Sequence, residues 1–223
     1  MARTRVAVMI SGRGSNMKAL IDAATAADYP AEIVLVISNV PGAGGLAVAD
    51  AAGIQTLAID HKSFGKGADG KHQFESAVTK ALKNAGADLV CLAGFMRLLS
   101  DGFVNEWYGR LINIHPSLLP AFKGLDVHAD MLRAGVKIAG CTVHYVSVDM
   151  DAGPIIGQAA VAVLSDDTPE TLAARILEQE HQLYPECVRR IAASEIRLGA
   201  NGLAEIGGPQ ASGALANPSI SPR

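Results

Sequence analysis

The segment Arg5–Asn16, with the sequence RVAVMISGRGSN, decides the fold class of this 223-residue chain. Its first part, Arg5–Ser11, is a short and almost continuous apolar run, which is typical of a strand that is buried on both faces. The turn that follows contains two glycines and leads into a pattern with helical periodicity, and Ser15 or Asn16 can cap that helix. A buried strand that runs directly into a helix predicts a parallel sheet, because parallel strands need such crossovers.

The same alternation of strand and helix continues through the first 93 residues. The predicted strands are Glu32–Ser38, Gln55–Ile59 and Asp88–Ala93, and the predicted helices are Gly45–Ala52 and Lys71–Asn84. This pattern is typical of an α/β fold with a mostly parallel, Rossmann-like sheet and helices on both faces. The polar, glycine-rich stretch Asp60–Gly70 is predicted to be a mobile loop.

The pattern changes after residue 120. A helix is predicted over Val127–Ala134, and the two alternating runs Ile138–Val148 and Ile155–Val163 predict an antiparallel addition to the sheet. Thr168 and Pro169 are typical of the start of a helix, which we expect to continue to about residue 193. A small hairpin is predicted over residues 196–206. We therefore expect one domain over residues 1–206 and a flexible tail, rich in Gly, Ala, Ser and Pro, over residues 207–223.

Composition excludes several classes of protein. The net charge is −3, from 19 basic and 22 acidic residues, and no long basic run is present, so no nucleic-acid partner is expected. The three cysteines lie far apart without a CxxC pair, which indicates neither a zinc site nor disulfides. The sequence contains no signal peptide, no apolar run of membrane-spanning length and no cluster of residues at metal-ligand spacing. We therefore expect a soluble, cytoplasmic protein without metal or membrane partners.

Three loops should meet at one edge of the predicted sheet, because ligands of such sheets bind beyond the carboxyl ends of the strands. The segments are Gly12–Asn16, Gly94–Leu99 and Asn113–Pro120, and each falls at the end of a predicted strand. The first is either an ordinary tight turn or a phosphate site, since N–H groups at a helix start bind anions. Met17 replaces the third glycine of the dinucleotide fingerprint, so a phosphorylated small molecule is favoured over NAD.

The run Leu111–Pro120, LINIHPSLLP, carries the candidate chemistry. Asn113 and His115 alternate with apolar residues and therefore share one face of a strand. A carboxamide and an imidazole that point the same way can stabilise an oxyanion and transfer a proton, although a hydrogen-bonded core histidine is the alternative. Asp151, in the turn after the next strand, is either an ordinary turn residue or a carboxylate that orients His115. His144 is interpreted as a structural residue.

Together, four motifs resemble the folate-dependent formyltransferases, and among them the phosphoribosylglycinamide formyltransferases. The motifs are ISGRGSN (10–16), LAGFMRLLS (92–100), INIHPSLLPAFKG (112–124) and DMDAGPIIGQ (149–158). The resemblance covers roughly residues 5–206 and implies a single formyltransferase domain there. It also implies that the formyl group of 10-formyltetrahydrofolate is transferred to the amine of phosphoribosylglycinamide in purine biosynthesis, by a monomer or weak homodimer.

The resemblance assigns roles to individual residues. Asn113 and protonated His115 would stabilise the tetrahedral oxyanion, while Asp151 would keep His115 charged and help to move a proton. The residues matching the family's ribotide contacts are Gly14, Ser15, Asn16 and Glu180. The residues matching the folate contacts are Met96, Arg97, Leu98, Leu99, Asn113, Ser147, Val148, Asp149, Met150 and Asp151. Leu119–Pro120 matches a cis peptide bond of the family. A basic folate contact in the loop after the third strand is not assigned, because only Lys66 of that loop could replace it.

Two other readings remain open. Formyltetrahydrofolate deformylase shares the three catalytic positions but carries a regulatory domain before the catalytic one, whereas this chain starts at its first predicted strand. A phosphoribosyl-ligand sensor, which is not an enzyme, would need the phosphate loop but not Asn113, His115 and Asp151. The presence of all three argues against the sensor.

Overall fold

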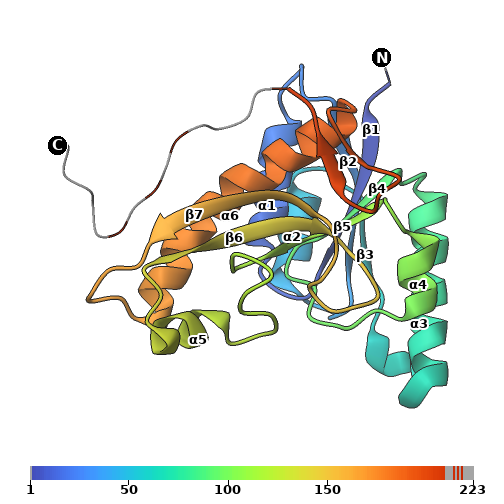
Figure 1. The fold of residues 1–223 in the computed structure, drawn as a ribbon. Coiled ribbons are helices and arrows are strands. Elements are labelled where there is room, and N and C mark those ends of the chain that lie inside the picture. Colours follow the sequence, from blue (N-terminus) through green and yellow to red (C-terminus); the bar gives the residue numbers. More distant parts are fainter. Residues whose placement is uncertain (1, 209–212, 214, 216, 218–223) are drawn as a thin grey trace.

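The structure is a computed structural model that describes residues 2–208, 213, 215 and 217. Its main strands are β1 Thr4–Ile10, β2 Ala31–Ser38, β3 Thr56–Ala58, β4 Leu89–Leu92, β5 Leu111–His115, β6 Ile138–Tyr145 and β7 Ile155–Ala162. They form one sheet in the order β3-β2-β1-β4-β5-β6-β7 (Figure 1). The strands from β1 to β5 pair in parallel, whereas β6 pairs antiparallel with β5 and β7. The predicted sheet is thereby confirmed.

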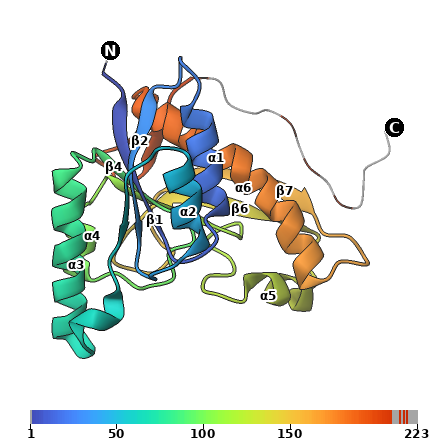
Figure 2. The ribbon, with the colours of Figure 1, turned by 180° about the vertical axis from the view of Figure 1, so that it is seen from behind.

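Helices cover both faces of this sheet. They are α1 Ser15–Ala24, α2 Gly44–Ala51, α3 Gly67–Asn84, α4 Asp101–Glu106, α5 Val127–Ala134 and α6 Pro169–Ala192. Figures 1 and 2, which view the molecule from opposite sides, show α1, α2 and α6 on one face and α3 and α4 on the other. The predicted helix at residues 127–134 is confirmed to the residue, and α4 was not predicted.

Strand β1 explains why the sheet is buried on both faces. Val6 and Val8 belong to the hydrophobic cluster beneath α1 and α6, whereas Ala7 and Met9 belong to the cluster beneath α3 and α4. All four side chains are fully buried. Because successive residues of a strand point to opposite faces, a strand between two helical layers must be apolar at every position. The continuous apolar run in the sequence is the consequence.

The start of α1 differs from the prediction. The N-cap residue is Gly14, in the left-handed conformation with φ 74°, and no side chain caps the helix. Ser15 and Asn16 are already helical, so the prediction that one of them caps the helix is wrong. Glycine adopts positive φ without steric cost, which permits the sharp turn between β1 and α1. The first N–H groups of α1 therefore remain without a side-chain partner from a cap.

The segment 60–70 is not a loop throughout, which corrects a second prediction. Residues His61–Phe64 form a 3-10 helix, and α3 begins at Gly67. The Asp60 side chain accepts a hydrogen bond from the Lys62 N–H at 2.9 Å. The Phe64 ring packs edge-on against Phe74 of α3, at 6.1 Å between centroids. A local cap and an aromatic contact therefore order a segment whose glycines and polar residues predicted mobility.

The hairpin predicted near the C-terminus is confirmed as β8 Ile196–Leu198 and β9 Ala204–Ile206. Most of the predicted flexible tail, residues 209–212, 214, 216 and 218–223, lies outside the described residues.

The three cysteines, Cys91, Cys141 and Cys187, are free and buried, as core residues are. Within the described chain, no helix has both the length and the apolar character that crossing a membrane requires.

An ion-pair cluster at the end of α6 gives a prediction for acid stability. Arg189 and Arg190 both donate to the Glu186 carboxylate, at 2.7–2.9 Å. The Arg189 guanidinium lowers the pKa of Glu186 to about 2. The stabilisation is complete above the ordinary glutamate pKa near 4.5 and is lost as the pH falls toward 2. Because Glu186 is 46% exposed, we expect the cluster to contribute less than about 1 kcal/mol.

We therefore expect Glu186→Gln to lower the free energy of unfolding at pH 7 by a few tenths of a kcal/mol, and by less at pH 3. Urea unfolding at the two pH values measures this difference. Glu178→Gln, on the same helix, is the matched control. A deficit of the Glu186 variant that is equal at both pH values would contradict this account.

Candidate active site

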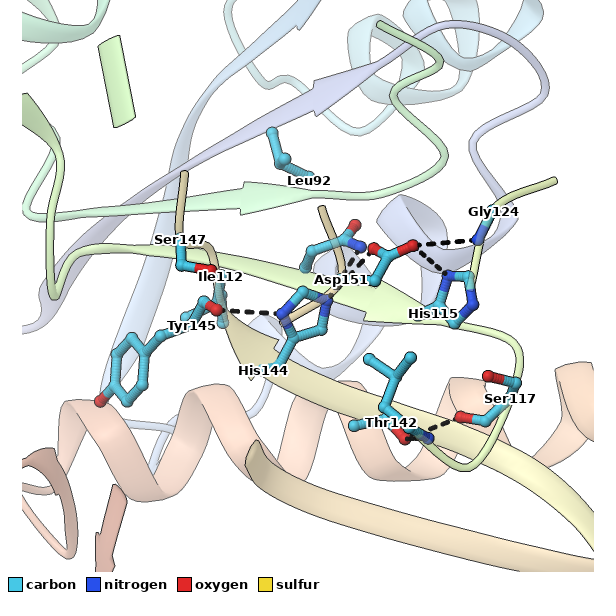
Figure 3. A network of polar contacts seen from close by, with 12 residues as sticks. Leu92, Ile112, His115, Ser117, Gly124, Thr142, His144, Tyr145, Ser147 and Asp151 are labelled. Atoms are coloured by element: carbon cyan, nitrogen blue, oxygen red, sulfur yellow. Dashed lines mark hydrogen bonds and ion pairs between the residues drawn. The ribbon is translucent and has the colours of Figure 1, made fainter. Parts of the chain in front are cut away.

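Two of the predicted catalytic residues meet at the end of β5. His115 is the last residue of this strand and is only 5% exposed. Asp151 lies in the turn after β6 with φ 49°, a left-handed conformation that aspartate tolerates better than most residues. Asp151 Oδ2 is 3.6 Å from His115 Nδ1 (Figure 3). The turn thus returns the carboxylate to the strand that carries the imidazole.

The second nitrogen of His115 also faces an acceptor. His115 Nε2 is 2.9 Å from the carbonyl oxygen of Phe122. A carbonyl can only accept, so Nε2 carries a proton in this arrangement. Nδ1 faces the carboxylate of Asp151 at 3.6 Å, so negative charge lies beside this end of the ring. The geometry therefore suits an imidazolium that stabilises negative charge on a reacting group.

His144 also belongs to this group, and the sequence interpretation of it as structural missed this. It lies directly opposite Asn113 in the antiparallel pairing of β5 with β6. Its Nδ1–H donates to the Tyr145 carbonyl oxygen at 2.9 Å, so Nε2 is free to accept. Nε2 lies 3.3 Å from Asn113 Nδ2 and 3.9 Å from Asp151 Oδ1. Only the register of two predicted strands could have revealed this position.

The protonation of His144 follows from its surroundings. Burial lowers its pKa, so the ring is neutral and accepts a hydrogen bond from the amide of Asn113. This contact fixes which end of the Asn113 side chain is the donor end. The amide has a second N–H, which remains available for a bound ligand. Across the described residues, no set of three or more His, Cys, Asp or Glu side chains is arranged to hold a metal ion.

The predicted ribotide residues also come together. Asn16 Nδ2 donates to Glu180 Oε2 at 2.6 Å, which joins α1 to α6 across 164 positions of the sequence. Burial raises the pKa of Glu180, which is only 6% exposed, and the Asn16 bond partly offsets this. Oδ1 of Asn16 is buried and has no hydrogen-bond partner among the described residues. At Gly14, an added Cβ would lie 3.1 Å from Gly45 Cα, so the turn is closely packed.

The predicted folate residues form two exposed apolar loops. Met96 and Leu98, after β4, are 67% and 69% exposed, and Val148 and Met150, after β6, are 50% and 53% exposed. The base of each loop packs against the same hydrophobic cluster, through Leu99 and Val146. Apolar side chains exposed on loops in this way are typical of a ligand site.

Other predicted folate residues make local contacts. The Arg97 guanidinium lies over the Phe74 ring, 5.5 Å from its centroid, and so is directed toward α3. Ser147 Oγ donates to the carbonyl oxygen of its neighbour Asp149. The peptide bond Leu119–Pro120, between β5 and α5, is cis, as the resemblance implied.

Ser11 connects the two candidate subsites. It is the residue immediately before the turn Gly12–Asn16. Its Oγ accepts a hydrogen bond from the Met96 N–H at 2.8 Å and donates to Asn39 Oδ1 at 2.6 Å. The phosphate loop and the apolar loop after β4 are therefore neighbours at the same edge of the sheet.

The chain is similar in sequence to known formyl transferases. The model of the formyl transferase family matches residues 4–188. The phosphoribosylglycinamide formyltransferase of Bacillus subtilis is 40% identical over 84% of this chain and 94% of its own length. The trifunctional purine biosynthetic protein adenosine-3 of Gallus gallus is 48% identical over 90% of this chain, and the chain spans only about a fifth of its length, 20%.

A solved structure is similar throughout the matched region. The crystal structure of phosphoribosylglycinamide formyltransferase from Brucella melitensis superposes with a TM-score of 0.81 at 54% identity, covering 86% of this chain and 96% of that one. The family model covers most of the chain, including β5 with Asn113 and His115, the turn with Asp151, and Glu180. The chain therefore belongs to the formyl transferase family.

Proposed function

We propose that this protein transfers the formyl group of 10-formyltetrahydrofolate to the amine of phosphoribosylglycinamide. The observation that carries the proposal is the contact of Asp151 with His115 and His144 at the end of β5, with Asn113 held by His144. The apolar loops after β4 and β6 suit a flat pterin ring. The uncapped start of α1 suits the phosphate of the second substrate.

The proposed reaction is acyl transfer through a tetrahedral intermediate. The amine nitrogen attacks the formyl carbon, and the electron pair of the carbonyl bond moves to oxygen. The free N–H of Asn113 and the cationic ring of His115 stabilise this oxyanion. The carbon–nitrogen bond to the folate then breaks, and a proton of the attacking amine is passed to the leaving nitrogen through water held by Asp151.

Asn16 and Glu180 are proposed to hold the ribotide. The buried Glu180 carboxylate accepts from Asn16 and fixes its side chain at the start of α1. We expect Glu180→Ala to raise KM for the ribotide about tenfold or more, because a hydrogen bond to a charged group is worth about 1.5–3 kcal/mol. KM for the folate should change by less than about twofold, because sites that share no partners respond independently to a substitution.

Steady-state kinetics with each substrate varied in turn measure both constants. Glu178→Ala, at an exposed position of the same helix, is the matched control. Equal changes in the two KM values of the Glu180 variant would contradict a specific role at the ribotide.

The proposed function is tested by incubating the protein with 10-formyltetrahydrofolate, with and without the ribotide. We expect tetrahydrofolate to form only when the ribotide is present. Release of tetrahydrofolate and formate without the ribotide would favour the deformylase. Binding of the ribotide without turnover of folate would favour the sensor.

A further inference from the structure

The turn Phe122–Gly124 contacts both His115 and Asp151 through its backbone. The Phe122 carbonyl oxygen accepts from His115 Nε2 at 2.9 Å. The Gly124 N–H donates to Asp151 Oδ2 at 3.2 Å, and Figure 3 shows this N–H on the same carboxylate oxygen that faces His115. Two backbone groups of one turn therefore hold the two ends of the His115–Asp151 pair.

This turn requires an unusual backbone conformation. Phe122 has φ 53° and Gly124 has φ 94°, both in the region that L-residues seldom adopt. A Cβ added at Gly124 would meet no atom within 4 Å, so the space around it is open. Glycine is therefore required at position 124 for its backbone conformation, which aims the N–H at Asp151, rather than for packing.

The base of the same loop is fixed by buried polar contacts. Thr142 Oγ1, on β6, donates to the Ser117 carbonyl oxygen at 2.7 Å, and both residues are fully buried. Gln158 Nε2, on β7, donates to the Leu119 carbonyl oxygen at 2.9 Å. Ser117 Oγ donates to the Ala121 carbonyl oxygen at 2.7 Å, directly before the turn. The turn is thus held by the sheet on which His115 lies.

Asp151 has few other contacts that fix its carboxylate. Its nearest ring nitrogens, on His115 and His144, lie at 3.6 Å and 3.9 Å, beyond ordinary hydrogen-bond length. Its neighbours Asp149 and Met150 are exposed. Among the described residues, the Gly124 N–H makes the one hydrogen bond to this carboxylate that the structure shows.

We propose that Gly124 is a positioning residue whose N–H holds the Asp151 carboxylate against His115 during the reaction. This inference rests on the proposed function and deepens it, because it assigns a backbone group to the alignment of the catalytic pair. A carboxylate displaced by about 1 Å would lose much of its effect on catalysis, since a misplacement of this size costs up to about 10²-fold in rate.

The test compares Gly124→Ala with Gly135→Ala. Gly135 follows α5, has φ 69°, and also has no atom within 4 Å of an added Cβ, so alanine strains the backbone there without contacting the site. We expect Gly124→Ala to lower kcat by about tenfold to 10²-fold with both KM values nearly unchanged. Gly135→Ala should leave kcat within about twofold, since it lies outside the site. Equal kcat in the two variants would overturn the proposal.

A double variant separates positioning from general strain. If Gly124 acts through Asp151, then adding Gly124→Ala to Asp151→Asn should lower kcat by no more than about twofold further. A further loss as large as that of the single Gly124 variant would mean that the two residues act independently, and would overturn the proposal.

A readout without turnover distinguishes this inference from the proposed function. The amide resonance of Gly124 in a ¹H–¹⁵N NMR spectrum should shift in Asp151→Asn and not in Asp149→Asn. If the unaltered protein transfers no formyl group but the resonance shifts as expected, only the proposed function fails. If the protein is active and the resonance does not respond to Asp151→Asn, only the positioning role of Gly124 fails.

Discussion

Asp151→Asn is expected to lower kcat for formyl transfer by about 10²–10⁴-fold, the usual contribution of general acid–base catalysis. Asparagine has the same shape, tolerates the left-handed conformation at φ 49°, and can still accept from the Gly124 N–H. It has no charge, however, so the side chain 3.6 Å from His115 Nδ1 no longer places a negative charge beside the ring. The loss should therefore appear in kcat, while the fold is retained.

Initial-rate kinetics and thermal unfolding of the same preparation check this result together. Asp130→Asn, in the first turn of α5 with a side chain that is 44% exposed, is the control for the loss of one negative charge. If the Asp151 variant keeps kcat within threefold of the unaltered protein, Asp151 has no part in proton transfer. If kcat falls and the thermal unfolding temperature of the variant falls sharply with it, the loss of activity is caused by loss of the fold instead.

Asn113→Ala is the second change expected to have a large effect, a loss of about 10²–10³-fold in kcat, as for removal of an oxyanion donor. The Asn113 amide donates one N–H to His144 and offers the other to the site. Alanine removes this donor, and KM for either substrate should change little, because the donor acts mainly on the charge that develops in the transition state.

The isosteric variant Asn113→Asp separates the effect of losing the N–H donor from the effect of changing the size of the side chain. It keeps the size of asparagine but has no N–H to offer, so it should be at least as impaired as the alanine variant. Rapid-quench measurement of a single turnover, with both substrates saturating, reports the chemical step in both variants. Asn113→Asp with near-normal single-turnover rates would exclude an oxyanion role for this side chain.

The strands and most helices could be predicted from the sequence because burial imposes a pattern on them. β1 contributes alternate residues to two hydrophobic clusters, and only a continuous apolar run can do so. The segment 60–70 could not be predicted, because its order depends on Phe64 meeting Phe74 and on a cap from Asp60. Such contacts outweigh the flexibility that its glycines confer, and no local pattern reveals them.

The candidate site was only partly predictable for a related reason. The period of a strand places Asn113 and His115 on one face. The place of Asp151 depends on a turn with a left-handed residue, and that of His144 depends on the register of β5 with β6. The N–H of Gly124 is a backbone group, so no pattern of side chains could indicate that it contacts Asp151.

The fate of a ¹³C-labelled formyl group tests the central claim most directly. The protein is incubated with 10-[¹³C]formyltetrahydrofolate and phosphoribosylglycinamide, and the products are followed by ¹³C NMR. The account predicts that the label appears as a formamide on the ribotide, in step with tetrahydrofolate, and that Asp151→Asn slows its appearance. A label that appears as free formate, at the same rate with or without the ribotide, would contradict it.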